Sequence, residues 1–114
     1  MKTNDAIKSL SALAQATRLE VFRLLVQRGM KGLSASVIAE KLGLPNATLS
    51  FHLKELSQAN LVSARQEGRF IYYAANYPAM NDLVGYLTEN CCSGNTCGVD
   101  FQPVKPSTSK RKSA

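Results

Sequence analysis

The chain has 114 residues, of which 45% are hydrophobic and 19% charged, and its formal net charge is +6. This length suits one domain, or one half of a dimer with a shared core, and no apolar run approaches the roughly 18 residues needed to cross a bilayer. The opening MKTNDAIKSL lacks the continuous apolar stretch of a secretion signal. We therefore expect a cytoplasmic protein with no membrane partner.

The excess positive charge lies mainly at the C-terminal end. Four of the 14 lysines and arginines lie in the last ten residues, at Lys105, Lys110, Arg111 and Lys112. Residues 1–100 therefore carry ten basic residues against eight acidic ones, a net charge of only +2. Segment 103–114 is polar, contains proline and shows no hydrophobic periodicity, which predicts a disordered basic tail. Such a tail can attract phosphates or only increase solubility, so charge alone does not establish DNA binding.

Two helices are predicted at the start of the chain. Residues 5–14 place four apolar residues on one helical stripe: Ile7, Leu10, Leu13 and Ala14. A second helix over residues 16–28 turns another apolar set inward: Leu19, Phe22, Leu25 and Val26. Gly29 is expected to end this helix.

A short third helix follows the connector MKGLS. The stretch SASVIAEKLG predicts a helix that Ser34 or Ser36 caps at its start and Gly43 closes at its end. Pro45 cannot extend this helix and Asn46 is a good N-cap, so the residues LPN predict a tight turn.

A fourth helix over residues 47–59 carries Leu49, Leu53 and Leu56 as its buried row. A helix, a three-residue turn and a second helix form the helix-turn-helix pattern. The second of these helices is then expected to be the recognition helix, which enters the major groove of DNA.

The remaining elements are a hairpin and a fifth helix. LVSAR and RFIYYAA are rich in β-branched and aromatic residues, and QEG joins them, with Gly68 suited to a positive φ. Residues 77–90 return to helical spacing with Met80, Leu83, Val84 and Leu87. We therefore predict a mainly α fold with a small β-hairpin, a winged helix-turn-helix of four helices, a hairpin and a last helix.

Helical geometry selects the outward face of the recognition helix. With Leu49 as the core direction and about 100° per residue, Phe51 lies roughly 200° away and Ala47 roughly 160°. Thr48 and Lys54 fall on either side of this outward face. The ring of Phe51 can contact a thymine methyl group, or it is an isolated surface aromatic residue of an ordinary kind.

Other residues of this helix are candidates for DNA contacts. Asn46, Thr48 and Ser50 lie near the helix N-terminus, where they can donate hydrogen bonds to phosphates or base edges. His52 is the only histidine, and its position at the edge of the core row makes it a packing residue or a phosphate contact.

The hairpin, or wing, offers two more cations. Arg65 and Arg69 flank the predicted turn, where a wing reaches neighbouring phosphates or the minor groove. The alternative is a pair of solvated charges at a strand edge.

Three stretches together resemble the ArsR family of metal-responsive winged-helix repressors: LSALAQATRLEVFRLL, VIAEKLGLPNATLSFHLKELSQANLV and RQEGRFIYYAAN. The TRL of the second helix, the LSFHLKEL of the fourth and the G-R-x-x-x-Y of the wing occur in order at the family's spacings. The resemblance covers about residues 5–90, and residues 1–90 are accordingly predicted to form one DNA-binding and dimerisation domain.

The resemblance implies a homodimer that binds double-stranded operator DNA and leaves it when an inducer binds. The family pairs its first and last helices, which assigns the interface to Ile7, Leu10, Leu13, Met80, Leu83, Val84 and Leu87. A stripe buried in a monomeric core is the alternative. In a dimer, the two reading faces would meet half-sites roughly 34–36 Å apart.

Two metal sites of the family are missing from this sequence. Arsenic-sensing members place a Cys-x-Cys pair in the helix before the recognition helix, where this chain has Ser34 and Ser36. Zinc-sensing relatives use aspartate and histidine on the last helix, which here has Asp82 and Glu89 but no histidine. Neither site can be transferred to this chain.

All three cysteines of the chain, Cys91, Cys92 and Cys97, lie within seven residues after the last helix. Thiolates are soft donors that select thiophilic ions, and three of them suit the pyramidal coordination of trivalent arsenic or antimony. Gly94 and Gly98 allow the chain to return Cys97 towards the other two. We therefore predict a sensor segment over residues 91–102, as in family members that have moved their arsenic cysteines, with no organic cofactor.

Other uses of these cysteines remain open. Zinc would need a fourth ligand, such as Asp100, water or a partner chain, whereas cadmium or lead can bind three sulfurs. Oxidation could link Cys97 to one of the pair, or the thiols could be free on a flexible tail. A thiol-dependent reductase is a weak alternative because the cysteines follow a helix C-terminus, which raises a thiol pKa. We therefore predict no enzyme but an arsenic(III)-responsive repressor of an arsenical-resistance operon.

Overall fold

A computed structural model describes residues 1–91 of the chain. The elements in chain order are α1 (Thr3–Leu13), α2 (Ala16–Arg28), β1 (Leu33–Ser34), α3 (Ala35–Leu42), α4 (Asn46–Gln58), β2 (Val62–Glu67), β3 (Phe70–Ala75) and α5 (Tyr77–Leu87). The predictions for Cys92, Cys97, most of the sensor segment and the basic tail fall outside the described residues.

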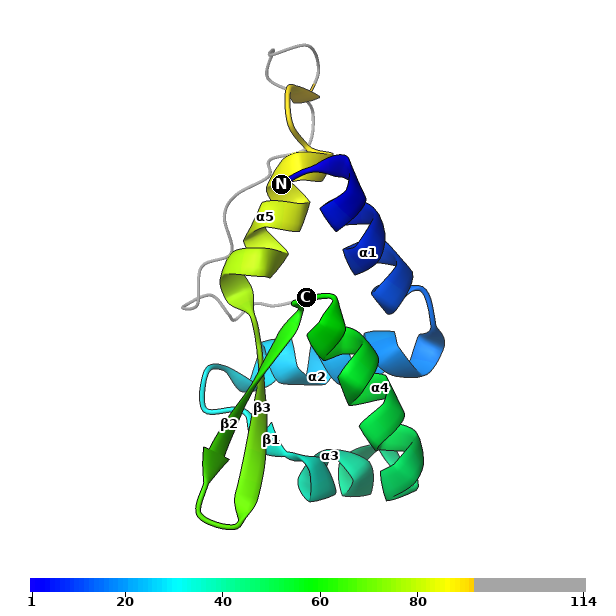
Figure 1. Cartoon of the computed structure of the whole chain (residues 1–114), viewed down its shortest axis with the longest axis vertical. Helices are drawn as coiled ribbons and strands as arrows, with labels where there is room; N and C mark the ends of the chain where they lie inside the picture. The colour runs from blue at the N-terminus through cyan, green and yellow to red at the C-terminus, as the bar shows by residue number, and fades with distance from the viewer. Residues whose placement is uncertain (92–114) are drawn as a thin grey trace.

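The predicted winged helix-turn-helix is confirmed, with one added strand. The connector MKGLS contains β1, whose two residues pair antiparallel with Tyr73 and Tyr72, so the sheet has the order β1-β3-β2. A two-residue strand is too short to show a period of two, and its pairing depends on residues far along the chain. Figure 1 shows α1 and α5 at one end of the molecule, with α3 and the wing turn at the other.

Helix α1 buries residues that the sequence did not single out, and the buried face of α2 differs in part from the predicted one. Helix α1 buries the small residues Ala6, Ser9 and Ala12, while Ile7 and Leu10 are exposed. Small side chains let α1 lie close to its neighbours, so the large apolar residues face outward. In α2, Phe22 and Leu25 are buried as predicted. Val21 takes the third inward position, while Leu19 is exposed and Val26 half-buried.

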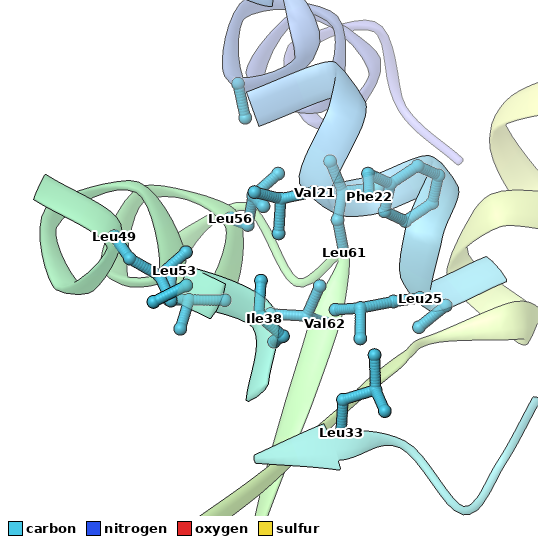
Figure 2. Packing of buried hydrophobic residues seen from close by; sticks show 13 residues of the cluster. Val21, Phe22, Leu25, Leu33, Ile38, Leu49, Leu53, Leu56, Leu61 and Val62 are labelled. Carbon is cyan, nitrogen blue, oxygen red and sulfur yellow. The ribbon is translucent and has the colours of Figure 1, made fainter. Parts of the chain in front are cut away.

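The core lies between α2, α3, α4 and the base of the sheet. Figure 2 shows the close packing of its buried side chains, which include Val21, Phe22, Leu25, Leu33, Ile38, Leu49, Leu53, Leu56, Leu61 and Val62. Each fully buried leucine or valine contributes about 1.5–3 kcal/mol to stability through removal of apolar surface from water. The recognition helix α4 supplies the three leucines of its predicted row, which are therefore confirmed as core.

The helix-turn-helix follows its predicted end signals closely. The Ser34 side chain accepts a hydrogen bond from the backbone N–H of Val37, and Gly43 closes α3 in the left-handed conformation at φ 66°. Helix α4 begins at Asn46, so Pro45 and not Asn46 occupies the N-cap position. The tight turn was predicted correctly, and only this boundary is shifted by one residue.

The wing, which is the hairpin of β2 and β3, extends further than predicted. Its strands pair in register from Val62↔Ala75 to Glu67↔Phe70, which places Gln66 and Glu67 in a strand and leaves Gly68 and Arg69 as the turn. Gly68 has φ 62°, as a two-residue hairpin turn with glycine in first place requires.

Helix α5 is fixed at both ends. The Asn76 side chain accepts from the backbone N–H of Ala79 at 3.3 Å, and the Tyr77 hydroxyl donates to the carbonyl of Val26 at 2.7 Å. At the other end, the Thr3 and Tyr86 hydroxyls lie 2.7 Å apart and join α1 to α5. Among residues 1–91, no helix is long and apolar enough to span a membrane.

Candidate DNA-binding surface

The recognition helix presents a polar surface because its leucine row fixes its rotation on the core. Leu49, Leu53 and Leu56 are at most 2% exposed, which turns the opposite face of α4 to solvent. The exposed set contains six of the residues predicted to contact DNA: Asn46, Ala47, Thr48, Ser50, Phe51 and Lys54. Phe51 is 55% exposed, a large apolar ring standing outside the core.

His52 lies on the buried side of α4 and not on its exposed face. Its side chain is 8% exposed, and its Nδ1 has no hydrogen-bond partner among the described residues. The ring meets Phe51 edge to face, with 5.6 Å between ring centroids. Three residues after Leu49, His52 turns back toward the leucine row, so the burial agrees with the packing alternative and not with a phosphate contact.

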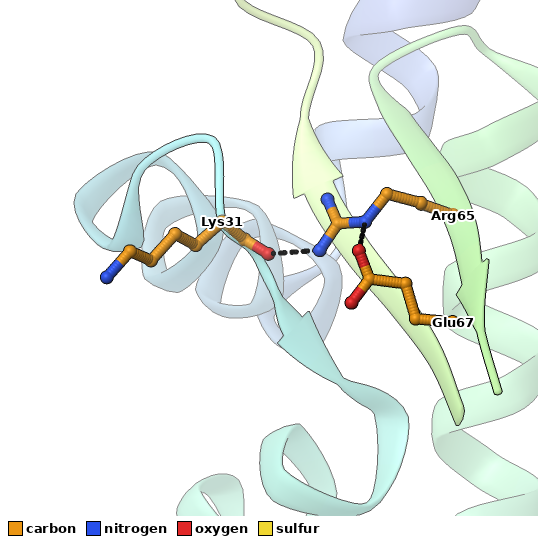
Figure 3. Close-up of polar contacts among 3 residues, drawn as sticks. All are labelled: Lys31, Arg65 and Glu67. Carbon is orange, nitrogen blue, oxygen red and sulfur yellow. Dashed lines mark hydrogen bonds and ion pairs between the residues drawn. The ribbon is translucent and has the colours of Figure 1, made fainter. Parts of the chain in front are cut away.

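The two wing arginines occupy different environments. Arg65 on β2 donates through Nε to the Glu67 carboxylate at 2.6 Å and through Nη2 to the Lys31 carbonyl at 3.1 Å (Figure 3). Arg69 is exposed in the turn and has no hydrogen bond or ion pair within the described part of the chain. Lys31 and Glu67 were not singled out by sequence reasoning, since a contact between residues 31 and 65 leaves no local signal.

The predicted dimer residues divide into three groups. Ile7, Leu10, Val84 and Leu87 are 42–58% exposed, as an unpaired interface requires. Leu13 and Met80 are half-buried. Leu83 is 6% exposed and belongs to the interior of the single chain, so for this residue the burial agrees with the core alternative.

An apolar hollow of about 440 Å³ includes Val84, one of the exposed members of this group, in its lining. Residues from three helices line it, including Leu13, Phe22, Met80 and Val84. A surface hollow lined by apolar side chains is typical of an interaction site rather than of bare solvent-facing surface.

The sensor end is described only as far as its first cysteine. Cys91 is half-buried, and its backbone N–H donates to the Thr88 carbonyl at 3.0 Å in the turn after α5. Within residues 1–91, no group of three histidine, cysteine or acidic side chains is placed to hold a metal ion.

The two family metal positions hold other groups. The Ser34 and Ser36 hydroxyls lie 3.4 Å apart at the start of α3, where Ser34 serves as the helix cap. Asp82 and Glu89 are exposed on and after α5. Hydroxyl groups are harder and weaker ligands for soft metals than thiolates are, so Ser34 and Ser36 do not replace the cysteine pair of the family.

Known proteins resemble this chain in both sequence and fold. A helix-turn-helix domain model matches residues 13–64. Nodulation protein NolR of Rhizobium meliloti is 34% identical over 105 residues, covering 92% of this chain and 79% of the relative. The arsenical resistance operon repressor of Bacillus subtilis is 34% identical over 85 residues, covering 75% and 77%.

The chain belongs to the ArsR family. An ArsR-like transcriptional regulator from Rhodococcus sp. RHA1 has a matching fold with a TM-score of 0.68, at 26% identity over 80% of this chain and 82% of that one. ArsR proteins are DNA-binding transcriptional regulators and not enzymes, which supports transcriptional repression as the general function. Because relatives named for nodulation and for arsenical resistance are both 34% identical to this ArsR protein, their names do not identify its signal.

Proposed function

We propose that this ArsR protein is an arsenic(III)-responsive repressor that binds operator DNA as a homodimer. Trivalent arsenic or antimony, bound by Cys91, Cys92 and Cys97, releases the DNA and derepresses an arsenical-resistance operon. One observation carries the proposal: the only three cysteines of the chain lie within seven residues, directly after the helix with the exposed apolar face. Three closely spaced thiolates suit a thiophilic, three-coordinate ion.

The exposed side of the recognition helix supports the DNA-binding part of the proposal. Small polar residues at the start of α4, namely Asn46, Thr48 and Ser50, lie where the backbone N–H groups and the helix dipole favour phosphate oxygens. Phe51 and Ala47 would supply apolar contacts to thymine methyl groups, and Lys54 and Arg69 would supply charge. The buried leucine row makes this surface rigid, which lowers the entropic cost of binding.

The exposed apolar row on α1 and α5 supports the dimer. Ile7, Leu10, Val84 and Leu87 would leave water when two copies pair, and the neighbouring hollow would accept side chains of the second copy. A shared core across the interface agrees with the short length of the chain.

Cys91 comes four residues after the end of α5, which suggests how the signal would reach the DNA. Binding of the ion would fix the cysteine segment against the end of α5, change the packing of this helix at the dimer interface and alter the spacing of the two recognition helices. Such release requires that the ion bind the DNA-incompetent dimer more tightly than the DNA-bound one.

A fluorescence-anisotropy titration on labelled upstream promoter duplex, under reducing conditions, tests this proposal. We expect tight, salt-dependent binding that arsenite abolishes near protein stoichiometry. Zinc, cadmium and a thiol oxidant serve as parallel arms. Release by one of these but not by arsenite would support a repressor of this promoter but show that its inducer is not arsenic.

Serine variants of the cysteines test the ligand set. Cys91→Ser, Cys92→Ser and Cys97→Ser should each bind the promoter like the wild type but resist release at the same arsenite concentration. Asp82→Asn is the matched control, because it alters the family's zinc position and should still release. A serine variant that releases normally would exclude its cysteine as a required ligand.

A further inference from the structure

Arg65 makes two contacts within the wing and one that ties the wing to the body of the protein. Its Nε donates to Glu67 on the same strand at 2.6 Å, and its Nη2 donates to the Lys31 carbonyl at 3.1 Å (Figure 3). The guanidinium carbon lies 5.4 Å from the ring centroid of Tyr72 on the neighbouring strand. A planar guanidinium can satisfy all three partners at once, whereas an ammonium group lacks its fixed fork of donors.

The loop that receives the Arg65 bond is itself firmly placed. Gly32 has φ +74°, and a Cβ at this position would clash with the carbonyl oxygen of Tyr73, so only glycine lets the loop lie this close to β3. The Arg28 Nε also donates to the carbonyl of Gly32 at 3.1 Å. The Lys31 carbonyl is therefore a fixed point on the body rather than the tip of a loose loop.

Arg65 also stands where the wing leaves the rest of the sheet. Strand β1 pairs only with Tyr73 and Tyr72, and Arg65 is the cross-strand partner of Tyr72. Beyond this register the wing has two strands, and its residues from 66 to 71 are all exposed. A two-stranded ribbon has little stability of its own, so its direction depends on what braces its base.

We infer that Arg65 is a positioning residue that sets the angle of the wing on the body, and that the phosphate contact of the wing falls to Arg69. The charge of Arg65 is paired with Glu67, whose carboxylate would repel a nearby phosphate. Arg69 sits in the exposed turn with no polar partner in residues 1–91. The inference rests on the proposed DNA binding through α4 and the wing.

The salt dependence of promoter binding separates the two roles. A phosphate contact adds about 0.9 to the slope of log affinity against log salt, and a dimer would lose about twice this amount. For a positioning Arg65, both Arg65→Lys and Arg65→Gln should weaken binding on the order of tenfold and flatten the slope as Arg69→Gln does, because the misplaced wing loses the Arg69 contact. A direct phosphate contact by residue 65 would instead survive in Arg65→Lys, which keeps the charge. Arg69→Gln is the matched control, which should weaken binding and flatten the slope by about 2 per dimer.

Footprinting of the same promoter duplex shows whether the wing alone is affected. In the Arg65 variants we expect lost hydroxyl-radical protection beside the half-sites, retained protection at their centres, and an unchanged melting temperature. Wild-type affinity and slope in Arg65→Lys would overturn the inference and leave the proposed function intact. Uniform loss of protection with a lower melting temperature would also overturn it. Failure of the wild type to bind would instead overturn the proposed function, and this inference with it.

Discussion

Helix α4 places Leu49, Leu53 and Leu56 at helical spacing, and α5 does the same with Leu83, Val84 and Leu87. All three leucines of α4 are at most 2% exposed, whereas on α5 only Leu83 is buried and its two companions are about half exposed. The same spacing therefore belongs to a buried core in α4 and to a largely exposed face in α5. Helical spacing identifies an amphipathic helix, but the tertiary structure decides what covers its apolar side.

Leu53→Ala should produce the largest loss, because it opens a cavity in a fully packed interior. We expect the free energy of unfolding to fall by about 2–5 kcal/mol, since the lost transfer energy and the cavity add together. Urea denaturation followed by circular dichroism measures this loss. Repeating the measurement over a range of protein concentrations separates the stability of one chain from that of a dimer.

Leu87→Ala is the matched substitution on α5. At low protein concentration, where the chain is monomeric, it should change the free energy of unfolding by less than about 0.5 kcal/mol, because the side chain is already in water. Equal losses for Leu53→Ala and Leu87→Ala at low concentration would show that the two helices do not differ in the way described.

Val84→Lys should break the proposed dimer without unfolding the chain. A charge in the exposed apolar row would be buried without a partner on pairing, at high cost. Sedimentation velocity should show monomer, and promoter affinity should fall by about a hundredfold or more, because the two half-sites are no longer bound together.

Asp82→Asn is again a suitable control, since it changes the charge of α5 by the same one unit. Asp82 lies about 200° from Val84 around the helix. It should leave both the sedimentation profile and the affinity near wild type. A Val84→Lys protein that remains dimeric would remove this face from the interface.

The features predicted correctly from the sequence are those that local geometry determines. The leucine row of α4, the glycines at 43 and 68 and the outward set of the recognition helix all follow from helical rotation or from the φ preference of a single residue. Ser34, one of the two predicted caps of α3, was found for the same reason, because its hydrogen bond spans three residues.

The features that were missed depend on residues far apart in the chain. Strand β1 exists only because β3 pairs with it, and the Arg65 bond joins residues 34 positions apart. The buried face of α1 was not predicted, because close helix packing selected the small residues Ala6, Ser9 and Ala12, which give no strong apolar signal. The presence of glycine at position 32, just before Leu33 and Ser34, was the only local sign that the loop lies close to β3.

Asn76 links the end of α4 to the start of α5, and its substitution should cost less than the core cavity of Leu53→Ala. Its Oδ1 caps the start of α5 through the N–H of Ala79, and its Nδ2 donates to the Asn60 carbonyl just after α4 at 2.9 Å. Asn76→Ala loses both bonds and should lower the free energy of unfolding by about 1–2 kcal/mol. Asn76→Ser keeps a capping oxygen but is too short to reach Asn60, so it should lose about half as much.

Thermal denaturation of the two Asn76 variants, with Asn81→Ala as an exposed asparagine control on α5, measures these differences. Serine and alanine variants of equal stability would mean that the cap contributes nothing and only the link to α4 matters. A serine variant as stable as the wild type would mean that the link to Asn60 contributes nothing and only the cap matters. The intermediate result is expected because the backbone N–H of Asn76 also donates to the Leu61 carbonyl at 2.9 Å, which keeps the junction closed after the side chain is shortened. The loss in the serine variant then measures the side-chain link alone, a polar connection between the proposed recognition helix and the helix that leads to the cysteines.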